Sequence, residues 1–167
     1  SRGLGDVYKR QDRTFPIDDS VFFEMGKHAD PRRFADYLCP LAEGRSIGVI
    51  SEAGCPAVAD PGADVVALAQ RRGYRVVPLV GPSSMILSVM ASGLNGQSFA
   101  FNGYLPIDDA DRVKRIKQLE QRAHNERQTQ LFIETPYRNR KLFDLLVRTL
   151  RPQTLLCIAA GITTPDE

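Results

Sequence analysis

The chain has 167 residues, of which 43% are hydrophobic and 25% charged, and its formal net charge is +2. This balance is typical of a globular protein and excludes a disordered or low-complexity chain, while the length suits one domain or two small lobes. Apolar runs stay well short of the roughly 20 residues that a membrane-spanning helix needs. Since the N-terminus also lacks a signal-peptide pattern, we expect a cytoplasmic protein.

Cysteines and histidines are few and far apart. Cys39, Cys55 and Cys157 show neither the paired spacing of zinc ligands nor a disulfide pattern, and we expect them to be reduced. Neither His28 nor His124 has a partner at metal-ligand spacing. The sequence therefore predicts no bound metal.

Residues 1–11 show neither helical nor strand periodicity, and we set them aside as a non-native or disordered extension. Beyond them, short apolar runs alternate with amphipathic stretches, as strands and helices do in an α/β fold. Asp30 followed by Pro31 is a good helix start, and Gly44 is a good helix end. The first half predicts, in chain order, a weak strand at 21–25, a helix at 30–44, a strand at 46–50, a helix at 62–72, a strand at 75–79 and a helix at 83–92.

Strand, helix and strand with short connections imply a right-handed crossover and parallel pairing. The first lobe, at 12–96, is therefore expected to hold a parallel sheet. Gly93, Asn95 and Gly96 form the break before a second α/β lobe at 97–167. There the pattern predicts a strand at 98–101, a basic helix at 110–126, a strand at 129–134, a helix at 138–150 and a strand at 154–159.

Three loops after predicted strands carry residue types that suit a ligand site. Ligands of open α/β sheets bind beyond the carboxyl ends of strands, where small residues let them approach the backbone. The loops are 51–62 (SEAGCPAVADPG), 80–84 (VGPSS) and 134–138 (ETPYR), the last bringing a carboxylate and a guanidinium. Each also has a purely structural interpretation, as a turn, as a helix N-cap at Ser83, and as a surface ion pair.

Motifs of several other enzyme classes are absent. The sequence contains neither GxGxxG nor GxxxxGK[ST], and it contains no GxSxG nucleophile elbow. Dinucleotide-dependent, nucleotide-hydrolysing and serine-nucleophile enzymes are therefore disfavoured. The region 112–151 has a large excess of Arg and Lys over acidic residues, which suits an RNA backbone but also a solvated helix face.

Four segments in this order resemble the motif series of ribosomal-RNA cytidine 2'-O-methyltransferases, a branch of the tetrapyrrole methylase family. They are SEAGCPAVADPG, RVVPLVGPSS, SGLNGQSFAFNGYLP and FIETPYR. Typical members have SDAGTP followed by DPG, then VPLPGP, GFLP and ESPHR, and the match runs from about His28 onward. The departures are Glu52 for Asp, Cys55 for Thr and Tyr137 for His.

The resemblance implies a two-lobed tetrapyrrole-methylase-like fold, with a parallel-sheet first lobe and an incomplete mixed-sheet second lobe. It also implies S-adenosylmethionine between the lobes and a homodimer. Because family members begin with a further strand and a glycine- and proline-rich loop and continue with more strands, the chain resembles an internal piece of such an enzyme. The cofactor-binding residues carried over are Ser51, Ala53, Gly54, Pro56, Asp60, Gly62, Pro82, Ser83, Thr135, Ile162 and Thr163.

The expected reaction is methylation of a ribose 2'-hydroxyl in 16S ribosomal RNA of the small subunit. Glu134 would accept the hydroxyl proton, and Arg138, Arg112 and Arg115 would contact RNA phosphates. Two alternatives stay open. One is methylation of a carbon of a precorrin- or uroporphyrinogen-type tetrapyrrole, whose anionic ring a basic lobe also suits, and the other is a non-catalytic remnant of the fold.

Overall fold

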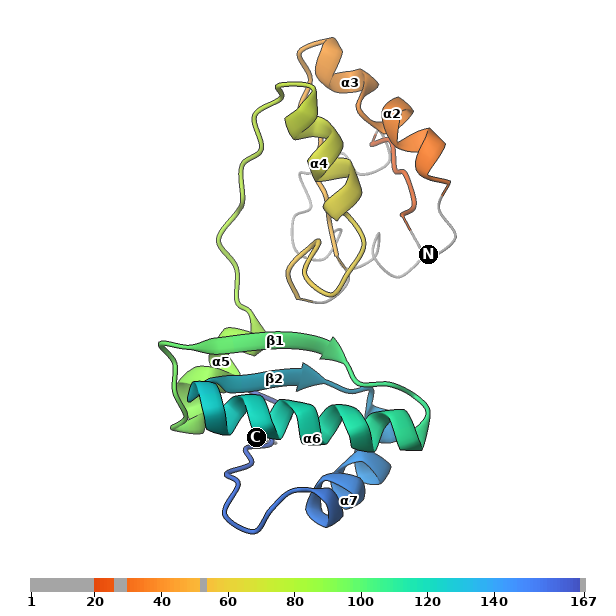
Figure 1. The fold of residues 1–167 in the computed structure, drawn as a ribbon. Helices are drawn as coiled ribbons and strands as arrows, with labels where there is room; N and C mark the ends of the chain where they lie inside the picture. The colour runs from red at the N-terminus through yellow and green to blue at the C-terminus, as the bar shows by residue number, and fades with distance from the viewer. Residues whose placement is uncertain (1–19, 26–29, 52–53, 166–167) are drawn as a thin grey trace. The chain divides into compact units, whose positions relative to one another are not determined.

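The structure, a computed structural model, describes residues 20–25, 30–51 and 54–165. The chain separates into two compact units, Ser1–Gly81 and Pro82–Glu167, each described by itself below (Figure 1). The extension expected at 1–11 lies outside the described residues, and the lobes expected at 12–96 and 97–167 stay a prediction. Of the helices in the described ranges, none has the length and apolar character to span a membrane.

Short helices pack around a small apolar core in the first unit. They are η2 (Pro31–Arg33), α2 (Phe34–Tyr37), α3 (Cys39–Ala42) and α4 (Ala63–Arg71). Asp30 starts the first turn, since its Oδ1 accepts a hydrogen bond from the Arg32 N–H at 3.0 Å. The core comprises Tyr37, Leu38, Val65 and Ala69. These helices confirm the helical segments predicted at 30–44 and 62–72.

The predictions of strands at 21–25, 46–50, 75–79 and 154–159 are wrong for this structure. In the described part of the chain none of these segments pairs with a neighbour, and several of their side chains are exposed, including Ile50 at 52%, Val77 at 54% and Leu155 at 78%. A strand depends on ladder hydrogen bonds and on burial of at least one face. Apolar composition alone supplies neither, and so the parallel sheet expected in the first lobe is not formed by the described residues.

The second unit is built on a parallel pair of strands, β1 (Phe99–Tyr104) and β2 (Thr129–Ile133), joined by α6 (Asp109–Glu126) (Figure 1). A parallel pair needs a crossover, which α6 provides. Asp108 caps α6, with its Oδ1 accepting from the N–H groups of Ala110 and Asp111 at 2.9 and 3.0 Å. These elements confirm the strands predicted at 98–101 and 129–134 and the helix predicted at 110–126. The described residues thus form an α/β fold, and the strands of their sheet pair only in parallel.

Three further helices, one of them a single 3-10 turn, complete the described part of the second unit. α5 (Ser84–Ser92) precedes β1, and η3 (Pro136–Arg138) and α7 (Asn139–Thr149) follow β2. α5 and α7 confirm the helices predicted at 83–92 and 138–150. Apolar residues of α6 and α7 meet Leu105 in one core. It consists of Leu105, Ile116, Leu119, Leu142 and Leu146, each at most 5% exposed. Burying side chains of this size contributes roughly 1.5–3 kcal/mol each, so this core supplies much of the apolar stabilisation of the second unit.

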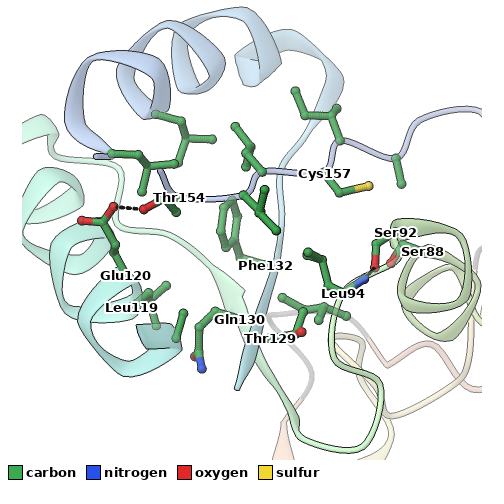
Figure 2. Close-up of a pocket in the computed structure, with 18 of the residues that line it drawn as sticks. Ser88, Ser92, Leu94, Leu119, Glu120, Thr129, Gln130, Phe132, Thr154 and Cys157 are labelled. Atoms are coloured by element: carbon green, nitrogen blue, oxygen red, sulfur yellow. Dashed lines mark hydrogen bonds between the residues drawn. The ribbon is translucent and has the colours of Figure 1, made fainter. Parts of the chain in front are cut away.

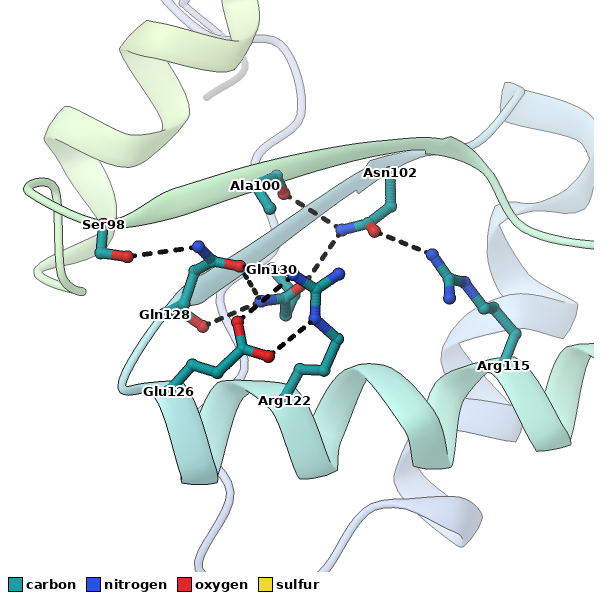
Figure 3. A network of polar contacts seen from close by, with 8 residues as sticks. All are labelled: Ser98, Ala100, Asn102, Arg115, Arg122, Glu126, Gln128 and Gln130. Carbon is teal, nitrogen blue, oxygen red and sulfur yellow. Dashed lines mark hydrogen bonds and ion pairs between the residues drawn. The ribbon is translucent and has the colours of Figure 1, made fainter.

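A β-bulge interrupts β1 near its carboxyl end. Phe101 pairs with Leu131, but the next pair is Tyr104 with Ile133, and Gly103 between them has φ of +63°. The Asn102 amide takes over part of the ladder, because its Nδ2 donates to Leu131 O at 3.2 Å. The same Nδ2 donates to Ala100 O at 3.1 Å (Figure 3). The bulge thus re-aims the chain, so that Leu105 reaches the core.

Candidate functional site

The loop after residues 46–50 folds into consecutive tight turns. Ala57 N–H donates to Pro61 O at 3.3 Å and Val58 N–H to Cys55 O at 3.2 Å. Ala57 and Ala59 have φ of 65° and 57°, a left-handed conformation that is uncommon outside glycine and is concentrated at functional sites. The loop therefore holds strain that its sequence alone does not reveal.

Gly62 closes this loop at a position where a side chain would be strained and crowded. Its φ is +130°, and a Cβ would lie 3.0 Å from Val49 Cγ1. Among the other predicted cofactor residues of this segment, Ser51 is half-buried and Gly54, Pro56 and Asp60 are exposed, while Ala53 lies outside the described residues. Small exposed residues on a tightly turned backbone suit close approach by a ligand.

Ser83 occupies the N-cap position of α5, as its structural interpretation predicts, with φ of −124° and ψ of 118°. Its carbonyl accepts from Leu87 N–H at 3.0 Å, but its hydroxyl makes no capping hydrogen bond. Pro82 before it is exposed. The serine hydroxyl is therefore not consumed by the helix end.

Glu134 lies directly after β2 and is nearly enclosed, with 5% of its side chain exposed. Its Oε1 accepts from Thr135 N–H at 2.8 Å and from Arg138 Nε at 2.8 Å, and Arg138 Nη2 lies 2.7 Å away. The Thr135 hydroxyl in turn accepts from Arg138 Nε at 3.1 Å. Oε1 of Glu134 thus accepts the hydrogen bonds that Thr135 and Arg138 donate to this carboxylate.

The other carboxylate oxygen of Glu134 is buried and has no hydrogen-bond partner. Leaving a buried acceptor unpaired costs about 1–3 kcal/mol, so such an atom calls for an explanation. Because Arg138 already balances the charge, Oε2 suits a neutral O–H or N–H donor better than a second cation. This oxygen is the most distinctive polar feature of the cluster.

A cavity of about 980 Å³ opens inside the second unit, and Glu134 and Ile162 both line it. Its wall comes from β2, from α5, α6 and α7, and from residues 153–160, and Figure 2 shows Phe132 and Leu119 among the apolar groups. The volume is at the upper end of the usual range for small-molecule sites. The cavity therefore joins two of the predicted cofactor and catalytic residues on one surface.

Glu120 of α6 anchors the segment that runs along this cavity (Figure 2). Its Oε1 accepts from Arg151 N–H at 2.8 Å and from Thr154 Oγ1 at 2.5 Å, and 8% of its side chain is exposed. Burial alone raises the pKa of this carboxyl, but the hydrogen bonds from Thr154 and Arg151, with the Arg151 charge, outweigh burial and hold the pKa below its usual value.

The lowered pKa of Glu120 makes a pH-dependent prediction. A depressed folded-state pKa adds stability above the unfolded-state value of about 4.3, and this contribution is lost as pH falls through the folded-state pKa. Glu120→Gln should lower the free energy of unfolding by about 1–3 kcal/mol at pH 7, with a smaller difference below pH 4, measured by urea denaturation. Glu126→Gln, in an exposed pair with Arg122, is the matched control and should cost less than 1 kcal/mol. A Glu120→Gln deficit that is the same at both pH values contradicts the prediction.

The three arginines expected to contact RNA differ in their surroundings. Arg112 is 2% exposed, and its guanidinium donates to Pro106 O at 2.6 Å and Ile107 O at 2.8 Å. Arg115 is half-buried and donates from Nη2 to Asn102 Oδ1 at 3.0 Å (Figure 3). Arg138 keeps 23% of its side chain exposed beside Glu134. Arg112 therefore fixes the loop before α6, and a phosphate contact by it would require that loop to open.

The structure brings only some of the expected site residues together. Glu134, Thr135 and Arg138 form one cluster in the second unit, whereas Gly54 and Gly62 belong to the first unit. The convergence of both groups on one cofactor stays a prediction. Sequence reasoning did not single out Asn102 or Glu120; the Asn–Gly pair inside a strand pattern was a signal for the bulge, while nothing local marked Glu120.

The chain was compared with known protein families and with known proteins. No family model matches the chain. Proteins named ribosomal RNA small subunit methyltransferase I do match it: that of Escherichia coli O157:H7 is 30% identical over 87% of this chain and 49% of its own length. That of Mesorhizobium japonicum is 34% identical over 100% of the chain and 53% of its own length.

A third relative of the same name, from Xylella fastidiosa, is 39% identical over 59% of the chain and 34% of its own length. The chain thus spans about half the length of the first two relatives. The name that these relatives share is the one expected from the order of the four motifs, and the α/β elements around the motifs are consistent with it. Over about half of their length, the chain is therefore homologous to proteins named ribosomal RNA small subunit methyltransferase I, in agreement with its resemblance to this branch of the tetrapyrrole methylases.

Proposed function

We propose that the protein carrying this chain transfers a methyl group from S-adenosylmethionine to a ribose 2'-hydroxyl of 16S ribosomal RNA. The observation that carries the proposal is the similarity, over the whole chain in one case, to relatives named as methyltransferases of small-subunit ribosomal RNA. The two-lobed tetrapyrrole-methylase fold, homodimerisation and a cytoplasmic location belong to the same proposal. The tetrapyrrole alternative has no relative in its favour among those described.

The fit to S-adenosylmethionine rests on the loops and on the cluster around Glu134. The strained turns at 54–62 present backbone groups past small residues, and the buried Glu134 Oε2 needs a neutral donor of the kind found on an adenosyl group or a ribose. We assign cofactor contacts to the predicted set: Ser51, Ala53, Gly54, Pro56, Asp60, Gly62, Pro82, Ser83, Thr135, Ile162 and Thr163. Small residues and backbone amides, rather than charged side chains, dominate this set.

Transfer from a sulfonium needs little covalent help from the protein. S-adenosylmethionine, when bound, supplies a methyl carbon on a good leaving group, and alignment with the attacking oxygen then dominates the rate. In our proposal Glu134 accepts the hydroxyl proton on Oε2, while Arg138 holds Oε1 and so fixes which oxygen faces the substrate. The ribose oxygen gains the methyl group, its proton passes to the carboxylate, and S-adenosylhomocysteine remains.

RNA binding would draw on the basic second unit. Side chains that are exposed include Lys114, Lys117, Arg127, Arg140 and Lys141, and contacts from them to phosphates would position the RNA without reading its sequence. Arg115 and Arg138 are proposed to join them. Arg112 takes part through the loop that it holds rather than at the surface.

The test is methyl incorporation by the full-length protein that carries this sequence. With labelled S-adenosylmethionine we expect incorporation into small ribosomal subunits and none into a uroporphyrinogen-type substrate, and nuclease mapping should place the label on a ribose oxygen. Label in the tetrapyrrole alone would establish the alternative. If calorimetry detects no S-adenosylhomocysteine binding by this protein, the enzymatic interpretation is lost altogether.

A further inference from the structure

Tyr137 is the most exposed aromatic side chain in the described part of the chain, at 82%. A single exposed aromatic residue is ordinary, so its surroundings decide its meaning. It lies in η3, three residues after Glu134, at the carboxyl end of β2. This is the edge of a parallel sheet at which α/β proteins bind ligands.

The tyrosine is held by a fixed neighbour. The Arg138 guanidinium carbon lies 5.4 Å from the centre of the Tyr137 ring, in the geometry of a cation–π contact. Arg138 is itself tied to the nearly buried Glu134 at 2.7 Å, and its N–H donates to Thr135 O at 3.0 Å. The exposed ring is therefore attached to a turn that an ion pair and a backbone hydrogen bond hold in place.

Two exposed bases follow the ring on α7. Arg140 is 91% exposed and lies 3.6 Å from Asp144, and Lys141 is 65% exposed and lies 2.8 Å from Asp109. Exposed ion pairs of this kind contribute little to stability, about 0–1 kcal/mol. A phosphate can therefore replace either carboxylate at small cost.

We propose that Tyr137 is a stacking platform for an unpaired nucleobase of the RNA substrate, with Arg140 and Lys141 on the adjoining phosphates. The inference rests on the proposed function. Proteins bind single-stranded RNA by combining aromatic faces for the bases with positive charge along the backbone, and this turn has both. Stacking would hold one nucleotide beside the cluster that contains Glu134, and would place its ribose for reaction.

The experiment uses the full-length protein and a single-stranded RNA oligonucleotide that contains 2-aminopurine, whose fluorescence falls when the base stacks. We expect Tyr137→Phe to bind and to quench like the unaltered protein. Tyr137→Ala and Tyr137→Leu should weaken binding by roughly 10- to 100-fold and lose the quenching, and the KM for RNA should rise more than kcat falls. Phe99→Ala is the matched control. Phe99 is an exposed aromatic residue at the first position of β1, and because β1 and β2 are parallel it lies at the other edge of the sheet from Tyr137.

The outcomes separate this inference from the function on which it rests. If the protein methylates ribosomal subunits but Tyr137→Ala binds and quenches normally, the stacking platform is refuted and the proposed function stands. If Tyr137→Leu behaves like Tyr137→Phe, the contact is apolar rather than aromatic, which also refutes it. A protein that neither binds the oligonucleotide nor methylates ribosomal subunits removes both.

Discussion

Replacing Glu134 with Gln in the full-length protein is expected to lower the rate of RNA methylation by about 100-fold or more, because general-base catalysis contributes roughly 10²- to 10⁴-fold. The amide keeps the shape of the carboxylate but cannot accept the hydroxyl proton at the position of Oε2, which is buried and without a partner in this structure. Single-turnover methyl transfer from labelled S-adenosylmethionine measures the loss.

A matched control distinguishes proton transfer from loss of the ion pair. Asp144→Asn removes the carboxylate of another Arg–acid pair four residues apart, that with Arg140, on an exposed surface. We expect its methylation rate to stay within about twofold of the unaltered protein, because exposed pairs contribute little. If Glu134→Gln also retains its rate, Glu134 holds Arg138 in place but is not the proton acceptor.

Helices were predictable from local sequence because their signals are local. Asp108 stands before the first turn of α6, and Ile116 and Leu119 recur at the spacing that puts them on one face. A capping side chain and an apolar stripe act within a few residues of each other. The same holds for α4, which starts after Gly62 and buries Val65 and Ala69.

Strands were predictable only where a partner exists within the described residues. β1 and β2 pair in parallel, with α6 as the connection between them. The equally apolar segments 46–50 and 154–159 pair with no strand in the described residues, and Ile50 and Leu155 are exposed. Pairing is a non-local property, and composition records only the tendency to be buried. Apolar runs therefore identify candidates for a sheet but do not assemble one.

In the candidate site, too, local features were predictable from the sequence and features that depend on distant residues were not. Motif order located Glu134 and Arg138 at the end of a strand, and the structure shows them in contact at 2.7 Å. The same reasoning treated Arg112 as a surface cation, yet it is 2% exposed. Residue type reports charge, but whether that charge reaches solvent depends on the loop that folds over it.

Replacing Arg112 with Met is expected to lower the free energy of unfolding by about 2–4 kcal/mol. The methionine side chain fills much of the space of the arginine stem, so the main loss is the donors to Pro106 O and Ile107 O. A buried guanidinium is costly in itself, and exchange of buried charges for apolar groups is sometimes neutral. Here two carbonyls would be left without these donors, and that effect should dominate. Equilibrium urea denaturation at constant pH measures the difference.

The control for Arg112 is an exposed base on the same helix. Lys114→Met removes one positive charge from α6 at an exposed position and should change stability by less than about 0.5 kcal/mol. Because Arg112 holds the loop that leads from the carboxyl end of β1 into α6, its loss should also raise hydrogen exchange at 105–108 more than elsewhere in the second unit. Unchanged stability together with unchanged exchange would show that the loop keeps its conformation without the guanidinium, and that Arg112 is available to bind phosphate after all.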